Sequence, residues 1–169
     1  YAGEWKNGKR TGQGTYIWSD GEKYAGEWED GKIHGKGVRT WPSGDKYSGQ
    51  WKNGEEDGYG TYIWSDGEKY AGEWKNGKID GYGTYIWSSG AKYAGEWKNG
   101  KRTGQGTYFW PDGSSWTGQF LNSKRTENGS YNYSKEERDA ARKMQLEMMR
   151  QTNDLMKSIY GNNQRIDLY

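Results

Sequence analysis

Aromatic and small residues alternate with polar residues along most of the chain, and the alternation repeats in a fixed unit. A tyrosine returns every 23 residues, with a tryptophan in the sixth place, at Tyr1, Tyr24, Tyr47, Tyr70, Tyr93 and Trp116. A glycine two positions later and an aromatic residue four positions later keep the same step. Such self-similarity is typical of a repeat architecture, so function is sought first in a repeated surface.

One unit, residues 61–83, predicts two strands. Tyr70, Gly72 and Trp74 alternate with polar or small residues, and a period of two places them on one face of a sheet. In the strand that follows, we expect Gly81 to share that face with the aromatic residues. Each unit therefore supplies one hairpin with a face of rings and glycines.

Two turn signals connect these strands. Asp66 with Gly67, and Asn76 with Gly77, favour the positive backbone angles that tight two-residue hairpin turns require. Six units in phase predict a mostly β fold, an elongated antiparallel ribbon of six tandem 23-residue hairpin repeats over residues 1–133. The sixth repeat is degenerate, since Trp116 replaces the tyrosine and Ser123 replaces the turn glycine.

The composition explains how a ribbon poor in aliphatic residues folds. The chain has 28 glycines, 11 tryptophans and 15 tyrosines. A glycine weakens a strand, but its missing side chain leaves a slot in which a neighbouring ring can lie. We therefore predict a core that is a ladder of rings over bare backbone, and we expect that a single repeat does not fold alone.

The stretch YAGEWKNGKIDGYGTYIW, from Tyr70 to Trp87, joins a tyrosine, a glycine, a Glu-Trp pair, an Asn-Gly turn, a Gly-x-Gly motif and a further aromatic residue. This order resembles the MORN repeat (membrane occupation and recognition nexus), and the resemblance covers residues 1–133. It implies an extended antiparallel ribbon of hairpins. It also implies a cytoplasmic protein at cytoskeletal or ciliary structures or at the membrane periphery, with phospholipid head groups among the ligands of the family.

The composition changes after Tyr133, where glycine stops and helix formers begin. Ser134 and Glu137 form a capping box, so we predict an amphipathic helix over residues 134–160 and a short tail over 161–169. One face of this helix carries the apolar stripe Ala141, Met144, Met148, Leu155 and Ile159. Three covers for the stripe are open: the ribbon of the same chain, another protein chain, and a membrane surface.

The chemistry-bearing residues favour binding over catalysis. The chain has no cysteine and one histidine, His34, so it offers no nucleophile triad and no set of metal ligands, and we predict a protein that is not an enzyme and uses no cofactor. A net charge of +2 does not favour nucleic acid as the partner. The repeated glutamates, such as Glu73, are expected to meet water or a lysine on a neighbouring strand.

We predict a scaffold or adaptor that binds a helical or extended protein segment along the aromatic groove of the ribbon, or that uses its helix to join an assembly. A homo-oligomer is among the possible assemblies. The candidate contact residues are ladder members that we expect to be exposed, together with apolar residues of the helix: Tyr24, Trp41, Trp64, Tyr70, Trp87, Tyr93, Trp110, Met144, Met148 and Leu155.

An alternative function uses the edge on which the Asn-Gly turns lie. This edge gathers basic residues that nominate contacts to anionic phospholipid head groups, namely Lys75, Lys78, Lys98, Lys101 and Arg102. The acidic residues Glu29, Asp30, Glu55, Glu56 and Asp57 interrupt the basic row and weaken this alternative. The lysines also have a structural explanation, because charges on strand edges keep a ribbon in solution.

Overall fold

The computed structural model describes the backbone of residues 1–160, and the side chains of residues 1–144 together with Leu146, Glu147 and Arg150. The chain forms two units, Tyr1–Asn132 and Tyr133–Tyr169, and each unit is described by itself. The predicted tail, residues 161–169, lies outside the described residues.

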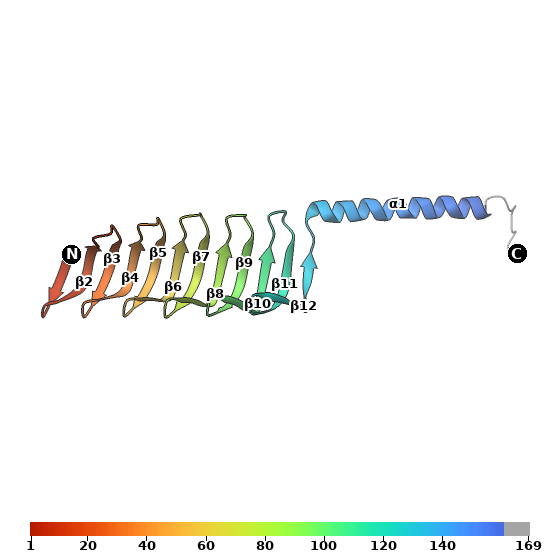
Figure 1. Ribbon diagram of the computed structural model, residues 1–169. Coiled ribbons are helices and arrows are strands. Elements are labelled where there is room, and N and C mark those ends of the chain that lie inside the picture. The colour runs from red at the N-terminus through yellow and green to blue at the C-terminus, as the bar shows by residue number, and fades with distance from the viewer. Residues whose placement is uncertain (161–169) are drawn as a thin grey trace. The chain divides into compact units, whose positions relative to one another are not determined.

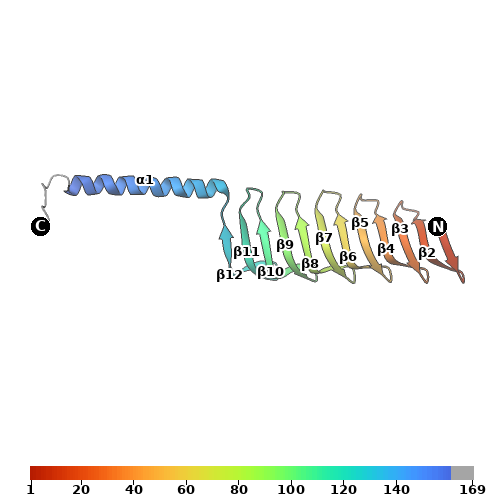
Figure 2. The same cartoon turned by 180° about the vertical axis from the view of Figure 1, so that it is seen from behind.

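The first unit is one antiparallel sheet of twelve strands that follow one another in sequence order (Figure 1), and the view from behind shows the same order (Figure 2). The strands are β1 (Ala2–Lys6), β2 (Lys9–Ile17), β3 (Lys23–Glu29), β4 (Lys32–Thr40), β5 (Lys46–Lys52), β6 (Glu55–Ile63), β7 (Lys69–Lys75), β8 (Lys78–Ile86), β9 (Lys92–Lys98), β10 (Lys101–Phe109), β11 (Ser115–Leu121) and β12 (Lys124–Asn132). The predicted mostly β ribbon of hairpins is confirmed.

The Asn-Gly dipeptides form the tight turns that the sequence predicts. Asn76 has a φ of 48° and Gly77 a φ of 71°, and the flanking Lys75 and Lys78 are paired across the hairpin. Two consecutive positive φ angles are typical of the two-residue turn that matches the twist of antiparallel strands. The same geometry recurs in every repeat, so these turns set the register of each hairpin.

The Asp-Gly dipeptide lies in a longer loop, so the prediction of a two-residue turn there is wrong. Trp64 N–H donates to the carbonyl oxygen of Glu68 at 3.0 Å, and Gly67 N–H donates to the carbonyl oxygen of Trp64 at 3.0 Å. Gly67 has a φ of 88°, whereas Asp66 keeps a negative φ and its carboxylate accepts the N–H of Glu68 at 3.0 Å. This is the three-residue loop that ends in a left-handed residue.

A bulge interrupts each hairpin near its Asn-Gly turn. In β7 and β8 the register passes from Gly72 opposite Gly83 to Trp74 opposite Ile79, so three residues of β8 lie opposite Glu73. Gly81 lies in this bulge with a φ of 113°, and a side chain there would meet the Glu73 carboxylate at 2.6 Å. Our prediction that Gly81 shares the ring face is therefore wrong, because the bulge breaks the period of two.

The core consists of tyrosine rings that lie over paired glycines. Gly72 and Gly83 face each other, and a Cβ added to Gly72 would lie 2.4 Å from the Cα of Gly83. The ring of Tyr70 covers the pair, since a Cβ on Gly83 would lie 2.2 Å from its hydroxyl oxygen. Tyr24, Tyr47, Tyr70 and Tyr93 are all fully buried in this way. The predicted packing of rings over bare backbone is confirmed.

Tryptophan rings join each repeat to the next. Trp97 Nε1–H donates to the carbonyl oxygen of Gly83 at 3.2 Å, and the bond recurs with the same spacing of 14 residues at Trp28, Trp51 and Trp74. Tyr70 contacts Trp74 of its own repeat and Trp97 of the next repeat edge-on, at 5.3 and 5.7 Å. The buried Tyr70 ring therefore packs against two repeats, as stability through contacts between neighbouring repeats requires.

The second unit contains the helix α1 (Lys135–Tyr160), which confirms the predicted helix. Its first turn has the predicted capping box: Glu137 N–H donates to Ser134 Oγ at 3.1 Å, and Ser134 N–H donates to the Glu137 carboxylate at 2.9 Å. These reciprocal bonds satisfy two amide groups that the helix start leaves free.

The glycine pair gives a direct test of the core. We expect Gly83→Ala to destabilise the ribbon by about 1–3 kcal/mol, because the new methyl group overlaps the buried Tyr70 ring. Thr84→Val serves as the control, since it changes the adjacent residue on the opposite face, and it should stay within about 0.5 kcal/mol. Urea unfolding followed by circular dichroism measures both variants. Equal stability of Gly83→Ala and wild type would contradict the described packing.

The buried tyrosines predict loss of stability at alkaline pH. Burial raises the pKa of Tyr93 to about 12, and burial raises the pKa of Tyr24, Tyr47 and Tyr70 further. Below the unfolded pKa of about 10 both states keep these protons. Above it the unfolded state loses them first, so stability falls as pH rises from about 10 through 12. The urea midpoint of the wild type should fall across this range, and that of Tyr70→Phe should fall less steeply. Parallel curves for the two proteins would refute the raised pKa of Tyr70.

Candidate functional site

A second layer of rings packs against the buried tyrosines on the same face of the sheet. We call it the outer ring row, and its members are Tyr16, Trp18, Arg39, Trp41, Tyr62, Trp64, Tyr85, Trp87, Tyr108, Trp110 and Tyr131. From Trp41 to Tyr131 the centroids of successive rings lie 4.5–5.4 Å apart. The row therefore forms a continuous aromatic surface across the repeats.

Arg39 takes the place of a tyrosine in the outer ring row. Its guanidinium carbon lies 5.4 Å from the Trp18 ring centroid and 5.1 Å from that of Trp41. The carboxylate of Glu22 accepts from Arg39 Nη2 at 2.7 Å, and both side chains are largely buried. A half-buried cation in this row thus has an acidic partner, which compensates for its removal from water.

The predicted contact residues of the ribbon divide into two groups. Trp41, Trp64, Trp87 and Trp110 belong to the outer ring row and are half-buried. The exposure that we predicted for Tyr24, Tyr70 and Tyr93 is wrong, because all three are fully buried over the glycine pairs. A pattern of period two shows which face a ring occupies, but it does not show which of two ring layers on that face meets water.

The predicted contact residues of the helix all lie on α1. Met144 is 65% exposed, and Leu146, which lies outside the predicted stripe, is 56% exposed. The side chains of Met148 and Leu155 are outside those that the structure describes. Their part in binding stays a prediction.

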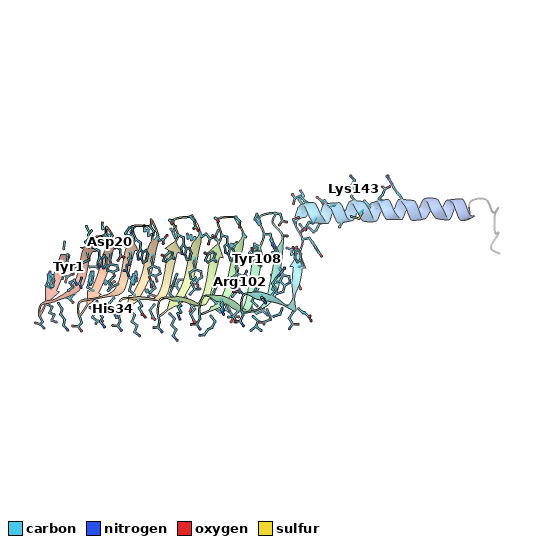
Figure 3. All side chains as sticks on the ribbon, viewed as in Figure 1. Tyr1, Asp20, His34, Arg102, Tyr108 and Lys143 are labelled. Atoms are coloured by element: carbon cyan, nitrogen blue, oxygen red, sulfur yellow. The ribbon has the colours of Figure 1, made fainter. Side chains whose placement is uncertain are left out.

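Arg102 does not lie on the lysine edge where the sequence placed it. Its guanidinium lies among rings, 5.6 Å from the Tyr108 centroid and 5.5 Å from that of Phe120 (Figure 3). Arg10, at the same repeat position, lies 4.4 Å from the ring of Trp28. This position is opposite Trp5 or Trp97, which occupy one aromatic repeat position across the hairpin, so its side chain points to the ring face.

The lysine edge consists of exposed residues that are paired across the Asn-Gly turns. Lys75 pairs with Lys78, and Lys98 pairs with Lys101. Asp80 offsets part of this charge, because its carboxylate accepts from Lys98 Nζ at 3.1 Å. Burial alone would raise the pKa of Asp80, but hydrogen bonds from the Asn99 N–H and from Lys98 lower it overall. The basic edge is therefore less uniform than the sequence indicated.

The opposite face of the sheet carries a groove that sequence reasoning missed. We call it the small-residue trough, and its floor follows neighbouring strands through Thr15, Ala25, Val38, Ser48, Thr61, Ala71, Thr84, Ala94, Thr107 and Thr117. One part of the trough has a volume of about 910 Å³ and a second part about 470 Å³. Glycine backbone lies between the small side chains, so no large side chain fills the groove.

Exposed apolar side chains flank the trough. Tyr59 and Tyr82 line it and are 63% and 57% exposed. Ile17, Ile63 and Ile86 follow two residues after Thr15, Thr61 and Thr84 of the floor, so they share its face of the sheet, and they are 63%, 40% and 39% exposed. The signal was present in the sequence, because threonine, alanine, valine or serine recurs between the ring positions of each repeat. Our prediction for that face concerned only the repeated glutamates, so it did not include a groove.

The model of the MORN repeat family matches five consecutive segments of the chain, residues 1–23, 24–46, 47–69, 70–92 and 93–115. The chain belongs to the MORN repeat family. The sixth MORN-like hairpin, β11 and β12, lies outside the matched segments except for its first residue, Ser115, and keeps the same pairing. Its turn contains Asn122 and Ser123 at φ angles of 48° and 66°, so serine adopts the conformation that glycine has elsewhere.

A search of curated proteins found no match. Among solved structures, one similar chain belongs to the SAS-4 (dCPAP) TCP domain of Drosophila melanogaster, solved in complex with a proline-rich motif of Ana2 (dSTIL). The sequence identity is 9%, the TM-score is 0.44, and the match covers 72% of the MORN chain and 70% of that chain.

The repeated glutamates of the MORN ribbon bind backbone amides, whereas we had expected water or lysine. Glu73 Oε1 accepts the bulge N–H of Tyr82 at 3.1 Å, and the bond recurs in other repeats at 2.7–3.1 Å. Gln50 makes the same bond to Tyr59 N–H at 2.7 Å. An amide oxygen therefore serves as well as a carboxylate, and the position has a structural role in the bulge.

The described residues give no sign of a metal centre. No group of three or more histidine, cysteine, aspartate or glutamate side chains among them has an arrangement that would hold a metal ion. His34 lies toward the Asn-Gly edge of the ribbon (Figure 3), with its Nδ1 3.4 Å from the Glu29 carboxylate. No helix in the described part of the chain combines the length and apolar character that a membrane crossing needs.

The bulge bond can be tested with a substitution that the ribbon already contains. We expect Glu73→Ala to lower the stability by about 1 kcal/mol, because the Tyr82 amide loses its acceptor. Glu73→Gln should stay within about 0.5 kcal/mol, as Gln50 forms the same bond. Urea midpoints separate these outcomes, and similar losses for both variants would show that the charge of Glu73 matters rather than its hydrogen bond.

Proposed function

We propose that this MORN ribbon is a non-enzymatic scaffold that binds a helical or extended segment of a protein partner along the small-residue trough. The observation that carries the proposal is a groove that Tyr59 and Tyr82 line while they stay 63% and 57% exposed. Ile17, Ile63 and Ile86, which are 63%, 40% and 39% exposed, follow two residues after Thr15, Thr61 and Thr84 of the floor and add apolar surface on the same face. Contiguous exposed apolar surface of this kind marks interaction sites on proteins.

The dimensions of the trough support this occupant. Its two parts, of about 910 and 470 Å³, both contact Tyr59 and together extend from β2 to β11. Small floor residues and glycine backbone leave room for side chains of a bound segment, and Tyr59 and Tyr82 line the groove beside them. The outer ring row is the other candidate face, but its tryptophans are half-buried and serve the core as well.

The ribbon contains its own conservative substitutions for a test. Gln13 and Gln105 stand where Tyr59 and Tyr82 stand in other repeats, and Thr40 stands where Ile63 and Ile86 stand. We expect the variant Tyr59→Gln/Ile63→Thr/Tyr82→Gln/Ile86→Thr to fold normally and to lose partner capture by at least about tenfold. Affinity capture by the intact chain, with quantitative mass spectrometry of the recovered proteins, compares the variant with wild type.

Two matched variants locate the contact. Trp64→Ala tests the outer ring row, and Met144→Asp tests α1. Proteins that wild type recovers at about 0.5 M salt, and that only the trough variant loses, support the trough. If the trough variant still recovers these proteins and Trp64→Ala or Met144→Asp loses them, the contact lies on the outer ring row or on the helix. That result would refute the trough as the binding face.

The rival function is a peripheral membrane adaptor. Its support is the exposed lysine edge, in which Lys75 pairs with Lys78 and Lys98 pairs with Lys101. If this function is correct, the protein sediments with anionic vesicles, and salt abolishes the sedimentation. Replacing the four lysines with glutamate should abolish it as well. Such a result, together with full capture by the trough variant, would favour the membrane adaptor over the scaffold.

A further inference from the structure

The ring face of the fifth and sixth repeats contains a pocket that is not part of the trough. Its volume is about 470 Å³, and it lies between β10, β11 and β12. Aromatic walls come from Tyr108, Trp110 and Phe120, and the cationic side chains are Arg102, Lys124 and Arg125. No acidic residue lines this pocket.

The two arginines are held by rings, which orients their guanidinium groups. Arg102 lies 5.6 Å from the Tyr108 centroid and 5.5 Å from that of Phe120, and Arg125 lies 5.2 Å from that of Trp110. Arg102 Nη2 donates to the carbonyl oxygen of Ser123 at 2.9 Å. A guanidinium has five N–H donors, so stacking against rings and one backbone bond leave most of the fork available to a ligand.

The charges in this pocket lack the compensation found elsewhere in the ribbon. Within the described residues, neither Arg102 nor Arg125 forms an ion pair with an acid, whereas Arg39 has Glu22 at 2.7 Å. Burial lowers the pKa of Arg102, and the positive charge of Arg125 lowers it further. A half-buried cation beside a second cation is unfavourable unless an anion joins them.

We propose that this pocket binds a phosphate group carried on an aromatic ring, as a phosphotyrosine side chain of a protein partner presents it. Three cations without an acid favour a dianion over a single carboxylate, and arginine forks bind phosphate oxygens in pairs. The walls of Tyr108, Trp110 and Phe120 favour an aromatic carrier. The identity of the carrier as part of a protein rests on the proposed scaffold function.

The first repeat offers a matched control for the cation–ring contact. Arg10 lies over Tyr16 and Trp28, at 4.9 and 4.4 Å, at the same repeat position as Arg102 and Arg125. The next residue at this repeat position is Ile33, so Arg10 has no second arginine beside it. If these arginines only cover the ring ladder, then Arg10, Arg102 and Arg125 are equivalent. A phosphate site requires the pair in the last two repeats.

Titration of the whole chain with phenyl phosphate, followed by calorimetry and tryptophan fluorescence, tests the pocket. We expect saturable binding that is at least about tenfold tighter than that of inorganic phosphate or benzoate. Arg102→Gln and Arg125→Gln should each weaken it at least about tenfold, and Arg10→Gln should leave it unchanged. Because Arg125 is exposed, its substitution tests the site even if Arg102→Gln disturbs the fold.

Three results would overturn the proposal. The first is the absence of saturable phenyl phosphate binding, and the second is an equal loss in Arg10→Gln and Arg125→Gln. The third is binding to vesicles that contain phosphatidic acid without binding of phenyl phosphate, which would assign the cations to a lipid surface. The trough variant should bind phenyl phosphate like wild type, so failure of the scaffold and failure of this pocket are distinguishable.

Discussion

The contact between a tyrosine ring and two facing glycines is the constraint on which the ribbon depends. Where Gly72 faces Gly83, the backbones leave no room for even one methyl group, and the ring of Tyr70 occupies the space above them. The hydroxyl group of that tyrosine donates to the Glu73 carbonyl oxygen at 3.1 Å, so the buried polar atom is satisfied. This contact gives the sheet a buried core built from its own side chains and backbone.

Some repeat positions outside the core contact and the turns differ between repeats. Position ten of the repeat is basic in Arg10, Arg102 and Arg125, apolar in Ile33 and Ile79, and acidic in Glu56. Burial raises the pKa of Glu56, while it lowers that of Arg102. One backbone frame thus presents apolar, acidic and basic side chains at one repeat position.

The sequence was sufficient for the repeat length, the Asn-Gly turns, the helix with its cap and the ring-over-glycine core, because these depend on local spacing. It was insufficient at Gly81 and at the Asp66-Gly67 loop, where an extra residue changes the register without changing the composition. It also did not distinguish buried Tyr70 from half-buried Trp64, because both occupy one face. The small-residue trough was missed since its floor is defined by pairing across ten strands rather than by a motif.

The order of the strands has a mechanical consequence. Since each strand pairs only with its neighbours in sequence, the ladder hydrogen bonds point along the length of the ribbon from β1 to β12. Tension applied to the two ends of the sheet loads these bonds in line and opens them one strand pair at a time. The sheet would therefore lengthen from an end by one strand at a time, while the hairpins away from the opening point keep their surfaces intact.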